Sequence, residues 1–142
     1  RGLGDVYKRQ GEVVAAGGLN AVLRDYARFG LLYMNEGRNY RGEQIVPAQW
    51  VHDSVTPDEP YLMPGRKMPS GKTAYGYGYQ WWIPVEPQGD FCGVGIYGQF
   101  IYVNPAKRVV IVKTSAYANY NVDGQAVKEE TINMFQSLAN AI

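Results

Sequence analysis

The feature that most constrains the fold is a stretch in which closely spaced glycines lead directly into an apolar run. The glycines are Gly93, Gly95 and Gly98, and the run is Gln99–Val103. Glycine frees the backbone torsion angles and removes side chains, so another group can approach the chain closely. The β-branched and aromatic run favours a strand that begins beside this accessible backbone. A β-bulge or a tight sheet bend is the other interpretation of the glycines, and spacing alone favours it.

The strand after the glycines is predicted to be half of a hairpin. Asn104–Lys107 is typical of a turn, and Arg108–Val112 is a second apolar strand. Both strands are apolar on both faces, so each face needs a covering layer. Helices predicted near Ala21–Glu36 and over Asp123–Ala141 can supply those layers. We therefore expect an α/β fold of the α+β type, with an antiparallel sheet flanked by helices.

The helix boundaries are predicted from capping residues. Asn20 and Asp123 are candidate N-caps, Gly37 fits the C′ position of the first helix, and Pro47 fits the first turn of a short helix over Pro47–Ser54. The expected buried residues are Trp50 and Val51 in the short helix and, in the terminal helix, Val127, Thr131, Met134, Phe135 and Leu138.

Aromatic residues alternate with glycines along Tyr75–Ile83, which predicts one strand. On such a strand Tyr75, Tyr77, Tyr79 and Trp81 share a face. We favour a core strand with another element packed over the glycines. An aromatic platform for a sugar ring or a base is the alternative.

The first ten residues look foreign to the rest of the chain. Asp5–Gln10 resembles the translated end of a sequencing adapter, so we interpret residues 1–10 as an adapter-derived segment. Residues 11–142 are then expected to be the C-terminal portion of a larger, incomplete domain. No charged-then-apolar export segment is present, which leaves periplasmic and cytoplasmic locations both open.

Composition excludes several classes of function. The net charge of +1 without a basic block argues against a nucleic-acid partner, and no apolar run is long enough to span a membrane. Cys92, the single cysteine, has no Cys or His partner at metal-binding spacing, and the lone His52 fits a surface position. No phosphate-binding or dinucleotide-binding motif occurs, so we expect no cofactor and no metal.

The chain contains no recognisable nucleophile motif. Ser54, Ser70, Ser115 and Ser137 lack a Gly-x-Ser-x-Gly or Ser-x-x-Lys context. Lys113–Ser115 invites comparison with the Lys-Thr-Gly box of penicillin-recognising enzymes. That box precedes the glycine turn, whereas Lys113 ends the second hairpin strand.

Four segments in order resemble the β-lactamase-related serine hydrolase family. This family includes class C β-lactamases, D-alanyl-D-alanine carboxypeptidases, esterases and aminohexanoate-dimer hydrolases, and the Gly-Ile-Tyr-Gly-Gln run most resembles the last group. The segments are Ala16–Leu19 with Arg24–Gly30, Ile45–Val51, Tyr75–Trp82 and Gly95–Phe100.

The resemblance implies a β-lactamase/transpeptidase-like fold and acyl transfer through a serine ester. The family's Ser-x-x-Lys pair and tyrosine would lie upstream of this chain. Aligning the box glycine with Gly95 puts Gly93 and Val94 where the family has Lys and Thr. The cation that holds a substrate carboxylate is then missing, which favours a small-molecule ester or amide substrate over a β-lactam.

The resemblance also assigns candidate site residues. It implies that the Ile96 N–H is an oxyanion-hole donor, exposed by Gly95, and that Gly93, Tyr97 and Gln99 contact substrate. Tyr97 would flank the acyl pocket, and Gln99 could offer its amide. Two alternatives remain open: a non-catalytic carbohydrate- or peptide-binding module built on the aromatic strand, and an inactive family homologue.

Overall fold

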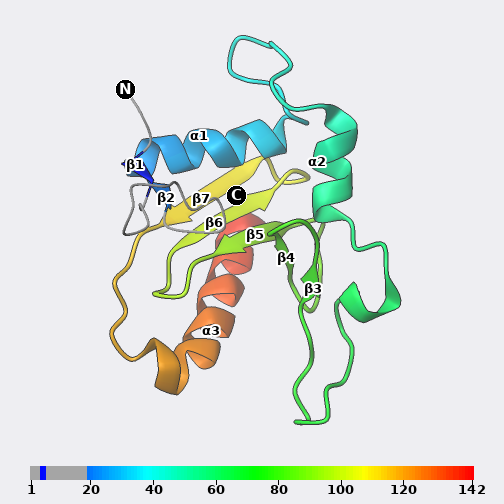
Figure 1. Ribbon diagram of the computed structural model, residues 1–142, viewed down its shortest axis with the longest axis vertical. Coiled ribbons are helices and arrows are strands. Elements are labelled where there is room, and N and C mark those ends of the chain that lie inside the picture. The colour runs from blue at the N-terminus through cyan, green and yellow to red at the C-terminus, as the bar shows by residue number, and fades with distance from the viewer. Residues whose placement is uncertain (1–3, 6–18) are drawn as a thin grey trace, which may run out of the picture.

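A computed structural model describes residues 4–5 and 19–142, and its main feature is a five-stranded antiparallel sheet between helices (Figure 1). The predicted adapter-derived segment therefore falls outside the described residues except for Gly4 and Asp5. The sheet has the order β3-β4-β5-β6-β7. Its strands are β3 (Gly76–Tyr77), β4 (Trp82–Ile83), β5 (Phe91–Val94), β6 (Phe100–Asn104) and β7 (Val109–Lys113); β1 (Gly4–Asp5) and β2 (Leu19–Asn20) form a separate pair.

The predicted hairpin is confirmed as β6 and β7, and both of its faces are covered. In β6, Tyr102 lies in the core on the α3 (Tyr120–Asn140) side, beside Phe135. Val103 lies in the core on the α1 (Leu23–Met34) side, where Tyr33 packs. The predicted α+β architecture, with helices on both faces of an antiparallel sheet, is therefore confirmed (Figure 1).

The three predicted helices exist, but their ends differ from the prediction. The N-caps are Val22 for α1, Pro47 for α2 (Ala48–Val55) and Asn119 for α3, none with a side-chain cap hydrogen bond. The prediction of Asn20 and Asp123 as caps was wrong. At the end of α1, Glu36 takes the left-handed C′ position with φ 54°, and Gly37 follows with φ 82°. The Gly37 N–H then donates to the Leu32 carbonyl at 2.8 Å, as in a Schellman motif.

The buried stripe of α3 is rotated from the predicted one. Met134 and Leu138 are about half exposed, at 48% and 49%. Thr131 and Phe135 are buried as predicted, and Ile132 and Ala139 take the other core positions. Neighbouring helix positions lie about 100° apart, so a one-residue error in choosing the stripe turns the face away from β6. Trp50 is also exposed, because its ring packs beside Tyr79 at the surface, with centroids 5.3 Å apart.

The predicted single strand over Tyr75–Ile83 is a tight hairpin instead. Gln80 has a φ of 69°, and the Gly78 N–H donates to the Trp81 carbonyl at 2.9 Å, which closes the turn between β3 and β4. The turn carries Trp81 into the core beside Tyr33, while Tyr79 stays 49% exposed. The expected common face of four aromatic rings does not form, so the structure contradicts the aromatic platform.

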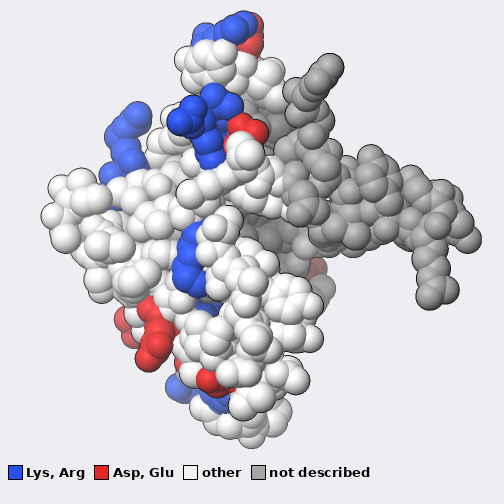
Figure 2. All heavy atoms as spheres, turned by 90° about the vertical axis from the view of Figure 1, so that its left-hand side faces the viewer, with Lys and Arg blue, Asp and Glu red and all other residues white. Residues whose placement is uncertain are grey.

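The surface carries few concentrated charges. On the face shown in Figure 2, acidic and basic side chains stand singly or in small groups over a largely uncharged surface. His52 is exposed, as predicted. Among the described residues, none of the helices has the length and apolar character needed to cross a bilayer.

Candidate functional site

Three of the five backbone N–H groups in the glycine-rich turn between β5 and β6 donate to acceptors within the turn itself. The Gly95 N–H donates to the Gln99 carbonyl at 2.8 Å, and the Gly98 N–H donates to the Gly95 carbonyl at 3.0 Å. The Tyr97 N–H donates to the Gln99 side-chain oxygen at 3.0 Å. The Ile96 and Gln99 N–H groups of this turn donate to no acceptor within residues 19–142. Of these two residues Ile96 is the more exposed, at 67%.

Two of the three glycines are required by this geometry. A Cβ at Gly95 would lie 2.5 Å from the Gln99 Oε1, so a side chain there would displace the group that holds the turn. Gly98 has a φ of 79°, which side chains disfavour. At Gly93, by contrast, the nearest atom to an added Cβ is 3.8 Å away, in the Trp81 ring. A side chain at position 93 would therefore meet no steric clash, so packing does not require glycine there.

The turn is tied to its surroundings at two carbonyls. The Lys113 ammonium donates to the Gly98 carbonyl at 2.9 Å from the end of β7. The Tyr117 N–H donates to the Tyr97 carbonyl at 3.0 Å, and the Tyr97 ring meets Tyr120 edge to face with centroids 4.8 Å apart. The turn is therefore held from β7 and from the segment that leads into α3.

A cavity of about 330 Å³ lies between the glycine turn and the start of α3. It contains three of the turn residues, Gly95, Ile96 and Gly98, whereas Gly93, Tyr97 and Gln99 are not among its walls. The structure therefore brings only part of the predicted set together. The remaining walls are Trp82, Val94, Phe100, Tyr117, Tyr120, Gly124, Gln125, Val127 and Lys128.

Lys128 is the single charged residue that lines this cavity. Its Nζ lies 4.6 Å from the centroid of the Trp82 ring and 4.5 Å from that of Tyr75. Burial lowers the pKa of Lys128, although the nearby Glu129 carboxylate acts in the opposite direction. Burial also raises the pKa of Tyr75 to about 12, with Glu129 adding to the effect. The cation is thus partly removed from water and held against aromatic faces.

Sequence reasoning missed Lys128, Tyr117 and Tyr120. The two tyrosines lie three residues apart, one in the segment before α3 and one at its first position, which is a weak local signal. Lys128 carries no signal at all, because its partner Trp82 is distant in sequence and the two meet only in the folded chain.

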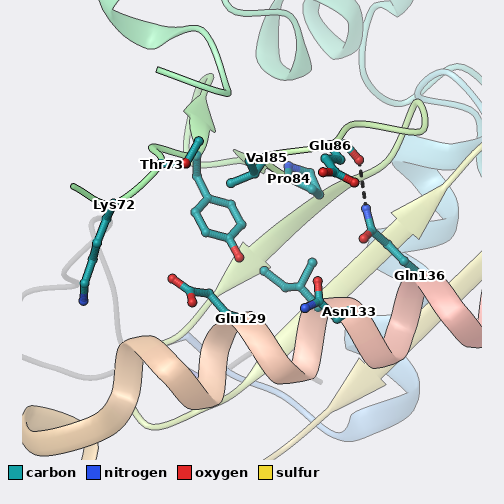
Figure 3. Close-up of a pocket in the computed structure, with 10 residues that line it drawn as sticks. Lys72, Thr73, Pro84, Val85, Glu86, Glu129, Asn133 and Gln136 are labelled. Atoms are coloured by element: carbon teal, nitrogen blue, oxygen red, sulfur yellow. Dashed lines mark hydrogen bonds between the residues drawn. The ribbon is translucent and has the colours of Figure 1, made fainter. Parts of the chain in front are cut away.

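A second cavity, of about 410 Å³, lies further along α3 (Figure 3). Glu129, Asn133 and Gln136 project from the helix toward the segment after β4, and the Gln136 amide donates to the Glu86 carbonyl at 3.2 Å. The glycine-turn residues do not line it, so we place the candidate site at the smaller cavity. No group of three or more His, Cys, Asp or Glu side chains suited to a metal occurs within the part of the chain that the structure describes.

Comparisons with known proteins agree with one another. The sequence model of the family described as Beta-lactamase matches residues 2–133. The chain is 31% identical over 103 residues to a 6-aminohexanoate-dimer hydrolase of Paenarthrobacter ureafaciens, covering 72% of this chain and 26% of that protein. A solved structure, a putative 6-aminohexanoate-dimer hydrolase from Bacillus anthracis, superposes with a TM-score of 0.76 at 35% identity, covering 96% of this chain and 33% of that one. The chain thus spans about a quarter to a third of the length of these relatives.

Proposed function

Because this chain belongs to the β-lactamase family of serine hydrolases, we propose that it forms one wall of an active site that cleaves an ester or amide through an acyl-enzyme. In this proposal the serine nucleophile, its Ser-x-x-Lys lysine and a tyrosine come from a preceding segment. The present chain contributes the oxyanion-hole donor and the pocket beside it.

The observation that carries the proposal is the exposed N–H of Ile96, which has no acceptor within residues 19–142. When a serine oxygen attacks a carbonyl, negative charge develops on the carbonyl oxygen, and a fixed backbone donor stabilises it. Three other backbone donors in the turn, those of Gly95, Tyr97 and Gly98, are engaged and hold it in shape, and Ile96 is the more exposed of the two residues whose N–H is left over. Gly95 leaves the approach to that donor free of a side chain.

The remaining predicted residues take narrower roles in this proposal. The Gln99 side-chain oxygen is engaged by the Tyr97 N–H, so its carbonyl closes the turn and only its NH₂ group could reach substrate. Tyr97 is held against Tyr120 and flanks the site from outside the cavity. Gly93 lies within β5, opposite Ile101, and contributes an unobstructed strand surface rather than a contact.

The proposed substrate class follows from the absence of a lysine on β5, the strand before the turn. Gly93 and Val94 stand where penicillin-recognising members have Lys and Thr, so β5 offers no cation to a β-lactam carboxylate. The names of both relatives describe hydrolysis of a 6-aminohexanoate dimer, in which an amide joins two amino-acid units. These observations support an open-chain ester or amide as the substrate.

The test is to block the donor in the protein that carries both this chain and the serine segment. Gly95→Val should lower kcat about 100- to 1,000-fold on p-nitrophenyl butyrate, which is the typical cost of losing one oxyanion-hole donor. Because a side chain at position 95 also displaces Gln99, Gln99→Ala is the matched control and should lower kcat far less. A folded Gly95→Val protein with unchanged kcat would show that the glycines serve only to bend the sheet.

A further inference from the structure

We propose that Tyr117–Asp123, which joins the end of the link from β7 to the first turn of α3, is a lid that opens and closes over the cavity beside the glycine turn. The closed lid is attached to Tyr97, and Gly124 is its hinge on the helix side. This inference rests on the function proposed above only for the purpose of the motion, which is to admit substrate to Ile96 and then exclude water. The motion itself is measurable without turnover.

The two halves of α3 are held to the sheet very differently. In the second half, the Gln136 amide donates to the Asp90 carboxylate at 2.9 Å, and the helix buries four residues: Thr131, Ile132, Phe135 and Ala139. No residue from 120 to 130 is buried, and Val122 is 82% exposed. In Figure 1 the first turns of α3, in orange, extend beyond the strands. A segment with so little buried surface opens at a lower cost in free energy than the core.

The first turn of α3 is also weakly stabilised by its own sequence. Its N-cap, Asn119, makes no side-chain cap hydrogen bond. Gly124 follows this turn and lowers the intrinsic stability of the helix at that point. An added Cβ at Gly124 would meet only the Tyr120 Cβ, at 3.7 Å, so packing does not require glycine there. Its conformational freedom is therefore available to a hinge, and the irregular residues 114–116 provide the pivot on the β7 side.

The contacts that hold the lid closed converge on one residue of the glycine turn. The Tyr117 N–H donates to the Tyr97 carbonyl at 3.0 Å, and the Tyr120 ring meets the Tyr97 ring with centroids 4.8 Å apart. The Tyr117 hydroxyl donates to the Asp123 carboxylate at 2.6 Å, which ties the two ends of the lid together. This hydrogen bond raises the pKa of Tyr117, so the phenol stays protonated at neutral pH. Since Tyr117 and Tyr120 are both cavity walls, release from Tyr97 removes two walls at once.

Hydrogen exchange of the whole chain, followed by NMR, tests whether the lid opens as a unit. The Tyr117 amide is bonded to Tyr97, whereas the Val122 amide is bonded to the Asn119 carbonyl within the lid. We expect these two amides to report the same opening equilibrium, and the amides of residues 131–139 to report a far less frequent opening. Exchange at Val122 with Tyr117 still protected would be ordinary fraying of the helix end and overturns the inference.

Two variants should shift this equilibrium in opposite directions. Tyr117→Phe removes the bond to Asp123 and should raise the opening equilibrium about threefold at both amides, a modest factor because water competes for an exposed bond. Gly124→Ala should lower it roughly fivefold, because alanine favours the helix. Tyr61→Phe is the matched control, since it removes an exposed hydroxyl from residues 60–62 and should change neither amide. Failure of both lid variants to shift the two amides together contradicts the inference.

Thiol labelling tests whether the lid controls access to the cavity. Val94 is a half-buried cavity wall, so Val94→Cys places a reactive group inside, while the native Cys92 is fully buried. Labelling by iodoacetamide should be faster when Tyr117→Phe is added and slower when Gly124→Ala is added, by the same factors as the exchange. Equal labelling rates overturn the lid but leave the hydrolase proposal standing, because no substrate is turned over. Unchanged kcat in Gly95→Val refutes that proposal without bearing on the lid.

Discussion

At the scale of single residues, Lys113 acquires a role that its sequence context does not suggest. Lys113 pairs with Phe100 in the sheet register, and its ammonium bonds the Gly98 carbonyl. Lys113 does not match a Lys-Thr-Gly box, because it follows the glycine turn in the sequence instead of preceding it. In the folded chain, however, it lies on the neighbouring strand β7 and contacts the glycine turn. The cation fixes the turn that carries the Ile96 N–H.

Lys113→Met should therefore loosen the turn. Loss of one hydrogen bond to a charged group costs on the order of 1 to 2 kcal/mol. We expect the Gly95 and Gly98 amides to exchange with solvent roughly fivefold faster or more in hydrogen-exchange NMR. Lys107→Met is the control, because Lys107 lies in the turn between β6 and β7, and it should not change these exchange rates. Equal amide protection in the two variants would contradict the role of Lys113.

Cys92 predicts a specific loss of stability at alkaline pH. Burial raises the pKa of Cys92 from 9.0 to about 12, with Asp90 adding to the effect. Above pH 9 the unfolded chain loses the thiol proton and the folded chain keeps it, so the free energy of unfolding falls as pH rises toward 12. Between pH 9 and 10 the slope should approach about 1.4 kcal/mol per unit.

Urea unfolding at pH 8, 9 and 10 measures this contribution. Cys92→Ala will be less stable at every pH, because it leaves a small cavity, but its stability should decline less steeply above pH 9. The buried Lys128 contributes with the opposite sign in both proteins and cancels in the comparison. Parallel pH profiles would exclude the thiol as the cause.

The glycine-rich turn was predictable from sequence, whereas the cavity beside it was not, and the role of the Ile96 N–H stays a prediction. Gly95 and Gly98 mark Ile96 locally, because glycine spacing reports directly on backbone geometry. Lys128 and Tyr120 reach the cavity only through the packing of α3 against the sheet. Such contacts depend on which face the helix buries, and that face was predicted one position away from the real one.

At the scale of elements, the contact between α1 and the hairpin is set by one glycine. A Cβ at Gly30 would lie 2.7 Å from the Val110 Cγ1 and 3.1 Å from the Ile101 Cγ2. The helix can approach the sheet closely only because this position has no side chain. The cost is a glycine inside a helix, which lowers intrinsic helix stability by about 1 kcal/mol.

Two glycine-to-alanine changes should consequently act in opposite directions. Gly30→Ala should lower the free energy of unfolding by about 1 kcal/mol or more, because overpacking outweighs the gain in helix propensity. Gly124→Ala should raise it by about 0.5 to 1 kcal/mol, since a Cβ there meets only the Tyr120 Cβ at 3.7 Å. Chemical denaturation of both variants checks the pair, and a stabilised Gly30→Ala protein would show that α1 can shift away.

The elements themselves were largely predictable, since periodicity revealed three helices and the β6–β7 hairpin. The failure at β3 and β4 has a physical cause. Alternating aromatic residues and glycines are typical of a strand, but Gly78 fits beneath the Ser54 carbonyl and Gln80 adopts a positive φ, so the chain reverses there. The contact with Ser54 is a tertiary one and leaves no trace in local spacing.

At the scale of the whole molecule, the chain is proposed to supply an oxyanion-hole donor and a pocket, and its sequence contains no motif for a nucleophile. We therefore expect the purified chain of 142 residues to show no turnover of p-nitrophenyl butyrate. A protein that joins it to the preceding serine segment should restore turnover. A burst of p-nitrophenol from the chain alone, abolished by a serine-directed phosphonate, would locate a nucleophile within it.

The order of the strands also has a consequence for how the molecule acquires its structure. Strands β5, β6 and β7 are consecutive and pair in sequence order, joined only by Gly95–Gln99 and Pro105–Arg108. Short closures carry a small entropic penalty, whereas docking α1 on β6 closes a much longer loop. We expect Val109→Ala, in β7, to slow folding and Tyr33→Ala, in α1, mainly to speed unfolding, as φ-value kinetics can measure. The turn that presents Ile96 would then form in the nucleus, before the more distant α1 docks.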